Sequence, residues 1–194
     1  LDWVDVQDEV KEQIENFLNG GGLIFKSSNP ITIYAENTPN PNVIKFVANK
    51  RLVNTSHEFK SIESAQNCSI AKALFNHDFI SELYIDFNFI SITIKKENSW
   101  DNHIMEIREF ILSYIRDGNE IIDSKFDIEN DKNESIDFEN MDEISKEIAK
   151  LIDDQIKPAV ASDGGNILFQ SYDSKSKEVK VILQGACSGC PSST

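Results

Sequence analysis

The chain has 194 residues and a formal net charge of −14 at pH 7, and its 19 Lys and Arg are scattered among 33 Asp and Glu. A phosphate-binding surface needs clustered cations, so the charge pattern argues against a nucleic-acid partner. No apolar run approaches the roughly 20 residues that span a membrane. The N-terminus, LDWVDVQDEV, is acidic and helical in pattern, so we expect no signal peptide. Three cysteines make a poor disulfide framework, and we expect a reducing, cytoplasmic location.

The first segment, LDWVDVQDEVKEQIENFLNGGGLIF, resembles residues 98–122 of the same chain. At a constant offset, Trp3 aligns with Trp100 and Gly21 aligns with Gly118. The apolar residues between them recur at helical spacing, and the glycine follows as a C-cap would. We interpret this as a duplication in which residues 1–26 are the C-terminal helix of a truncated first module.

Residues 31–122 form the second, complete module. The β-branched runs at 31–35 and 43–47 predict two strands, joined by a turn at Thr38 to Asn42 that is rich in Asn and Pro. We expect a short helix at 62–76, a hairpin of strands 83–87 and 89–94 that turns near Asn88, and a helix from Trp100 to Gly118. The predicted fold class is α+β, with small modular domains whose sheets are mainly antiparallel and carry helices on one face.

Isolated residues of the two modules have simpler interpretations. Trp3 and Trp100 are expected to anchor cores, and Cys68 to be a small, partly buried residue. His57, His77 and His103 stand in separate contexts. We expect these three on the surface.

An acidic linker is predicted at residues 123–140. Between Asp123 and Glu143 there are nine acidic residues and two lysines, and such a stretch buries too little apolar surface to become ordered.

The last domain is predicted at 141–194. Asn140 and Glu143 have capping-box spacing, and Pro158 is expected to end the helix that follows. Its apolar stripe consists of Ile144, Ile148, Leu151, Ile152 and Ile156. A turn at Asp163 to Gly165 then precedes two strands, 167–172 and 179–185.

The second of these strands leads into GACSGCPSST, which contains Cys187 and Cys190. Pro191 suits the first turn of a helix, whose positive end and loop N–H groups would lower the pKa of both thiols. Glycine and polar neighbours predict that both cysteines are exposed. Such a pair suits a soft metal or a redox dithiol.

Two thiolates do not complete a zinc or iron–sulfur site, which usually has four protein ligands. A metal site therefore requires two chains, each contributing Cys187 and Cys190. One alternative is a thiol–disulfide oxidoreductase, although its CxxC would be expected after the first strand of a βαβ unit. The other is a zinc-clasped dimeric interaction module.

The segment KPAVASDGGNILFQSYDSKSKEVKVILQGACSGCPSST resembles the C-terminal domain of NifU-type iron–sulfur cluster scaffold proteins. YAENTPNPNVIKFVANKRLV is similar to the N-terminal domain of the Nfu branch of that family. The resemblance implies that Cys187 and Cys190 bind a [4Fe–4S] cluster between two subunits, and that the cluster is received from iron and sulfide donors and passed to apo-proteins. It implies a carrier rather than an enzyme.

The spacing of the cysteines alone does not distinguish [4Fe–4S] from [2Fe–2S] or zinc. In the family a further helix follows the CPSS segment, whereas this sequence stops at Thr194. We therefore expect a fragment at both ends with a truncated last domain.

Overall fold

The computed structural model describes residue 7 and residues 11–16, 30–128 and 141–190. Contacts within the chain divide it into two units, Leu1–Pro30 and Ile31–Thr194. In the first unit, residues 11–16 are helical and exposed. Trp3 and Gly21, on which the interpretation as a duplication depends, lie outside the described residues.

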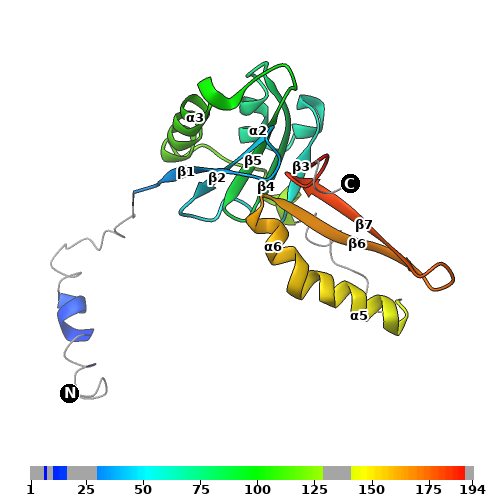
Figure 1. Ribbon diagram of the computed structural model, residues 1–194. Coiled ribbons are helices and arrows are strands. Elements are labelled where there is room, and N and C mark those ends of the chain that lie inside the picture. Colours follow the sequence, from blue (N-terminus) through cyan, green and yellow to red (C-terminus); the bar gives the residue numbers. More distant parts are fainter. Residues whose placement is uncertain (1–6, 8–10, 17–29, 129–140, 191–194) are drawn as a thin grey trace. The chain divides into compact units, whose positions relative to one another are not determined.

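A five-stranded antiparallel sheet, in the order β1-β2-β5-β4-β3, organises the first part of the second unit (Figure 1). Its strands are β1 (Ile33–Asn37), β2 (Val43–Ala48), β3 (His57–Phe59), β4 (Ile80–Asp86) and β5 (Phe89–Ile94). The predicted hairpin is confirmed, and it turns at Phe87 and Asn88, where Phe87 has a φ of 36°. Strand β3 was not predicted, because three residues of which two are polar carry no clear alternation.

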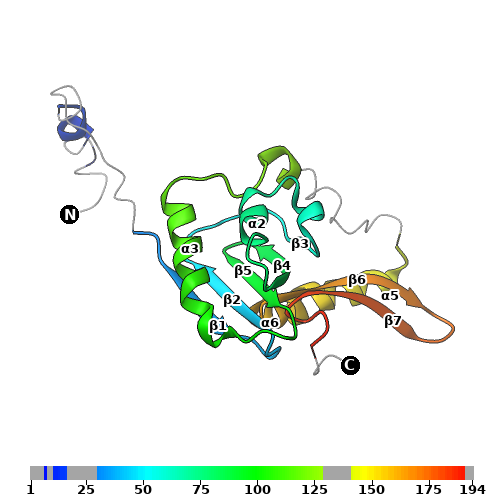
Figure 2. The same cartoon turned by 90° about the horizontal axis from the view of Figure 1, so that it is seen from above.

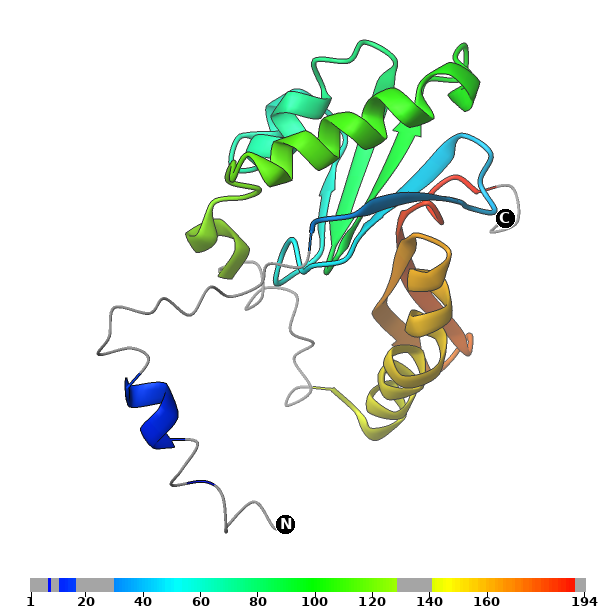
Figure 3. The same ribbon diagram turned by 90° about the vertical axis from the view of Figure 1, so that its left-hand side faces the viewer.

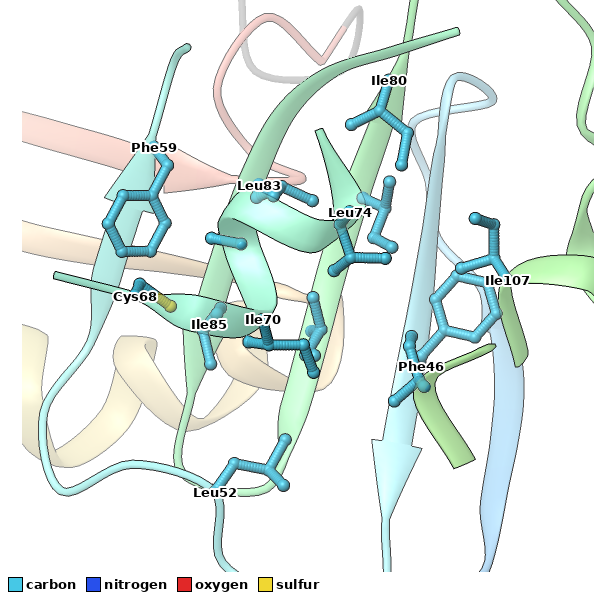
Figure 4. Packing of buried hydrophobic residues seen from close by; sticks show 14 of the residues in the cluster. Phe46, Leu52, Phe59, Cys68, Ile70, Leu74, Ile80, Leu83, Ile85 and Ile107 are labelled. Carbon is cyan, nitrogen blue, oxygen red and sulfur yellow. The ribbon is translucent and has the colours of Figure 1, made fainter. Parts of the chain in front are cut away.

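Helices cover one face of this sheet (Figure 2). They are η1 (Ile62–Ala65), α2 (Ser69–Leu74), η2 (Trp100–Asn102) and α3 (Ile104–Arg116), so the helix predicted at 62–76 is two shorter pieces. Figure 4 shows the core between them, where α2 side chains meet those of the strands. Trp100 is a core anchor as predicted, and its indole N–H donates to the carbonyl oxygen of Asn42 at 2.9 Å.

Residues 124–128, at the start of the predicted linker, are helical, and Phe126 and Asp127 among them pack against the module, which corrects that prediction. Asp127 is only 3% exposed and accepts a hydrogen bond from Nε2 of His57 at 2.9 Å. His57 is therefore buried rather than on the surface. Its ring stacks on Phe59 and Phe126. The rest of the linker, residues 129–140, lies outside the described residues.

The last part of the unit pairs two strands, β6 (Gly165–Asp173) and β7 (Glu178–Gly185), with a helical segment. This segment comprises α5 (Glu143–Leu151), a π-helical turn η4 (Ile152–Ile156) and α6 (Lys157–Ser162). The N-cap of α5 is Asp142, whose carboxylate accepts from the backbone N–H of Ser145 at 3.1 Å, rather than the predicted Asn140. Pro158 does not end the helix: it lies in the first turn of α6, where a missing N–H costs no helical hydrogen bond.

The predicted apolar stripe on this segment is buried only in part. Ile152 packs with Ala149 against Ile167 and Phe169 of β6, whereas Ile144, Leu151 and Ile156 are about half exposed. A sheet of two strands is narrow, and it covers only one edge of the stripe.

The second face of the five-stranded sheet lies against the end of α6 and the ends of β6 and β7 that meet it (Figures 1 and 3). All six residues of β2 are consequently buried. An antiparallel sheet often leaves one face in water, and here the inner strand β2 is covered on both faces. This arrangement was not predicted, and it brings the two halves of the unit together at the cysteine loop. Among the described helices, none has the length and hydropathy that crossing a membrane requires.

Candidate functional site

The two cysteines lie in a tight loop that begins where β7 ends. Gly185, paired with Gly165 of β6, has a φ of +60°, and this left-handed residue turns the chain out of the strand. The backbone N–H of Ser188 then donates to the carbonyl of Gly185 at 3.0 Å. Gly189 has a φ of +72°, which brings the chain round to Cys190. The loop therefore folds back on itself between the two thiols.

Both cysteines line one pocket of about 260 Å³. Its other walls in the described part of the chain are Pro39, Val160, Asp163, Leu183 and Ala186, which are apolar except for one carboxylate. Cys187 is partly exposed, and Cys190 is only 4% exposed. The expectation that both thiols are exposed is wrong for Cys190.

The electrostatic environment also differs from the prediction. Burial, together with the negative charge of Asp163 and the nearby Cys190, raises the pKa of the Cys187 thiol. The sequence pattern predicts the opposite direction, from loop N–H groups and a following helix. Because a thiol must lose its proton before it binds a metal, loading such a site releases protons.

The turn at Asp163 to Gly165 forms as predicted, and it lies directly beside the cysteine loop. Gly164 has a φ of +83°. A Cβ on Gly165 would lie 2.7 Å from Sγ of Cys187 and 2.6 Å from the carbonyl oxygen of Gln184, so only glycine fits there. The backbone N–H of Ala186 donates to the carbonyl of Gly164 at 3.1 Å. The turn and the loop therefore pack as one block.

The other candidate ligands lie elsewhere in the fold. Cys68 is fully buried, its thiol donates to the carbonyl of Ile121 at 3.3 Å, and burial raises its pKa to about 12. His77 and His103 are partly exposed and both lie near the carboxylate of Glu106. In the part of the chain that the structure describes, no three His, Cys, Asp or Glu side chains gather into a group that could hold a metal ion.

Reasoning from sequence missed the contribution of the five-stranded module to this site. Pro39 is a wall of the cysteine pocket, and the Asn40 side chain donates to the carbonyl of Ala186 at 3.3 Å. One signal was present: VIKFVA in β2 is almost continuously apolar, which is typical of a strand covered on both faces.

Two family models match the chain. Residues 33–118 match "Scaffold protein Nfu/NifU N terminal", and residues 148–194 match "NifU-like domain". Both ranges lie within the segments singled out above: the five-stranded module and the part that carries the cysteine loop.

Curated relatives match along most of the chain. "NifU-like protein 4, mitochondrial" of Arabidopsis thaliana is 31% identical over 92% of this chain and 61% of its own length. "NFU1 iron-sulfur cluster scaffold homolog, mitochondrial" of Drosophila willistoni is 30% identical over 88% of this chain and 58% of its own length. The chain thus spans about three fifths of the length of these relatives. A solution NMR structure of a NifU-like protein from Saccharomyces cerevisiae is 21% identical, with a TM-score of 0.44, over 52% of this chain and 91% of that one.

These names correct one prediction. The relatives are named as mitochondrial, so the expectation of a cytoplasmic location is wrong. Few cysteines indicate only a reducing environment, and more than one compartment of the cell is reducing.

Proposed function

Because the chain belongs to the Nfu-type family of iron–sulfur cluster scaffold proteins, we propose that it binds a labile [4Fe–4S] cluster through Cys187 and Cys190 and passes it to apo-proteins. The observation that carries this proposal is that two free cysteines line a single pocket at the end of β7. Thiolates are the ligands that iron–sulfur clusters take from proteins.

The pocket suits such a cargo chemically. Val160, Leu183 and Pro39 supply apolar walls, and a low-polarity surround limits access of water to a cluster. Among the described residues of the lining, Asp163 is the only acidic one, and it repels an anionic thiolate–cluster unit. The cluster would therefore be held by its two thiolates and weakened by one neighbouring charge, as release to an acceptor requires.

We propose that a second copy of the chain supplies the other ligands. Two cysteines leave half of the usual four positions open, and a two-fold dimer would present a matching pair. Transfer then needs only ligand exchange: a cysteine thiolate of the acceptor binds iron as one thiolate of this chain leaves and takes up a proton. No electron moves in that exchange, and the role is that of a carrier rather than a catalyst. Iron and sulfide would come from upstream donors.

Anaerobic reconstitution with iron and sulfide tests the proposal. The visible spectrum, the iron and sulfide per chain and the mass in solution would be recorded for the wild type, for Cys187→Ser and for Cys190→Ser. Cys68→Ser is the matched control, because Cys68 is buried in the other core. We expect a brown dimer with about two irons and two sulfides per chain, lost in both loop variants and kept in the control.

Two other results would each overturn the proposal. A colourless zinc-bound dimer would indicate a structural clasp. A monomer that reduces a disulfide substrate without iron would indicate a dithiol oxidoreductase.

A further inference from the structure

A polar row crosses the face of the five-stranded sheet that lies away from the helices. The strand registers place its members opposite one another from β1 to β3. The row consists of Glu36, Lys45, Ser91, Tyr84 and Glu58. Lys45 and Ser91 are nonetheless buried, Ser91 to 1% exposed, because the part of the chain that carries the cysteines covers them.

The centre of the row holds the end of α6 and the turn after it. The Lys45 ammonium donates to the carbonyl oxygens of Ala161 and Ser162 at 3.1 and 3.0 Å. These carbonyls belong to the last turn of α6, where helical partners are lacking and a cation is favoured. The Ser91 hydroxyl donates to the carbonyl of Gly164 at 2.6 Å. Lys45 thus binds backbone carbonyls at the end of α6, and Ser91 binds a backbone carbonyl of the turn that follows it.

Two further side chains of the same module hold the start of the cysteine loop. The Asn40 amide donates to the carbonyl of Ala186, and Glu58 accepts from the backbone N–H of Gly185 at 3.0 Å. Asn40 is 4% exposed and is itself fixed, since its side-chain oxygen accepts from the N–H of Asn42 at 3.1 Å. Its amide group is therefore aimed at the residue before Cys187.

The two sets of contacts act on one block. Gly165 packs against Cys187, and Ala186 bonds to Gly164, as described above. Holding the turn from one side and Ala186 from the other fixes the backbone on which Cys187 stands. The binding side chains come from β2, β3, β5 and the loop after β1. None of these hydrogen bonds engages a cysteine.

We propose that Asn40, Lys45 and Ser91 of the five-stranded module are positioning residues for the cysteine loop, so that this module forms part of the cluster site. The inference rests on the proposed function for its cluster readout. The hydrogen bonds themselves exist without a cluster, and they predict effects in the apo protein too.

The test compares Asn40→Asp with Asn37→Asp in the full chain. Both changes replace an amide with a carboxylate in or beside the loop that follows β1, but Asn37 is exposed and lies at the end of β1. Asn40→Asp removes the side-chain N–H donor and places a carboxylate oxygen opposite the carbonyl oxygen of Ala186. Lys45→Met, with Lys50→Met as its exposed control and Lys45→Arg as its conservative rescue, tests the other side of the block.

Three measurements are made on each variant. They are the backbone amide shifts of Ala186 and Cys187 in the apo protein, the alkylation rate of Cys187 read by peptide mass mapping, and the rate at which a chelator removes the cluster. We expect Asn40→Asp and Lys45→Met to shift both amides and change the alkylation rate severalfold. We expect cluster loss to be about tenfold faster, which corresponds to about 1.4 kcal/mol. In all three measurements Lys45→Arg should lie closer to wild type than Lys45→Met does, and the controls Asn37→Asp and Lys50→Met should equal wild type.

Amide shifts and alkylation rates equal to those of the controls would overturn the proposal, and so would shifted amides with cluster loss at the control rate. If the wild type takes up no cluster, the proposed function fails. The apo measurements then still decide the positioning: a change in amide shifts and alkylation supports it, and no change overturns it.

Discussion

Asp127 ties residues 124–128 to the five-stranded module, and Asp127→Asn tests how much this stabilises the fold. One carboxylate oxygen accepts from the backbone N–H and side-chain amide of Asn54 at 2.8 and 2.9 Å. The other accepts from the N–H of Thr55 at 3.1 Å and from Nε2 of His57 at 2.9 Å. The substitution keeps the shape, removes the charge and replaces one acceptor by a donor.

The substitution lowers the free energy of unfolding because N–H donors are left facing the new NH₂ group. In one orientation of the substituted amide both donors of Asn54 lose their acceptor; in the other the N–H of Thr55 loses it and His57 must change tautomer, in a site where Asp127 is 3% exposed. A buried donor without a partner costs about 1–3 kcal/mol, so we expect at least that loss, roughly 1–3 kcal/mol, in the free energy of unfolding.

The pKa of Asp127 sets how this loss varies with pH. Burial raises that pKa, but hydrogen bonds from His57, Asn54 and Thr55 outweigh the burial, and the net pKa is lowered. A carboxylate with a lowered folded pKa stabilises the fold above its unfolded pKa of about 3.9 and loses that contribution as the pH falls through the folded value. The gap between wild type and Asp127→Asn should therefore be full at neutral pH and narrow below about pH 4.

Urea unfolding followed by Trp100 fluorescence measures this gap, in a Trp3→Phe background so that only the buried tryptophan reports. Asp123→Asn is the matched control. Asp123 caps the same short helix by accepting from the N–H of Lys125 at 2.8 Å, and asparagine caps about as well. If Asp127→Asn falls within about 0.5 kcal/mol of this control at neutral pH, or if the gap persists unchanged in acid, the reasoning is refuted.

Three further outcomes are expected. Gly118→Ala should cost about 1–2 kcal/mol for its left-handed backbone alone, because its Cβ meets nothing, whereas Gly164→Ala should cost more, because its Cβ would lie 2.8 Å from the Ser91 hydroxyl. Adding Ser91→Ala should narrow that difference in thermal unfolding, and an unchanged difference would contradict the steric argument. Cys68→Ala should lower the stability by about 1–3 kcal/mol without changing the iron content after reconstitution, since its thiol is buried in the helix-covered core; a loss of iron would contradict this. The alkylation rate of Cys187, whose pKa is raised, should reach half of its maximum above about pH 8.5, the midpoint expected for an exposed thiol; a midpoint at or below that pH would show that its pKa is not raised.

Local patterns predicted the elements that local chemistry determines. The β-branched runs around Ile33 and Phe46 became strands, and the helical periodicity after Trp100 became α3. The turn at Gly164 follows from its place between a helix and a strand, where a left-handed residue is needed. Within such elements only the ends shifted.

Contacts between distant residues were not predictable in this way. His57 and Asp127 are 70 residues apart in sequence, and no local pattern connects the two positions. The composition of the acidic stretch correctly indicates little apolar surface, yet a single carboxylate with enough donors holds its first turn in place. Hydrogen bonding to the backbone of another element leaves no periodic signal.

The same reason explains why the docking of the cysteine loop was missed. The polar row binds carbonyl and amide groups, so it selects the path of the backbone rather than the side chains of the turn. To form these hydrogen bonds the backbone of the turn and of the loop must lie close to the sheet, where a side chain would not fit. A Cβ on Gly185 would lie 2.7 Å from the Tyr84 ring. In the sequence, Gly164 and Gly185 indicate only turns. In the structure, the absence of a side chain at these two glycines also lets the backbone approach the sheet. Through this contact the five-stranded module, which contributes no cysteine to the pocket, can influence Cys187 and Cys190.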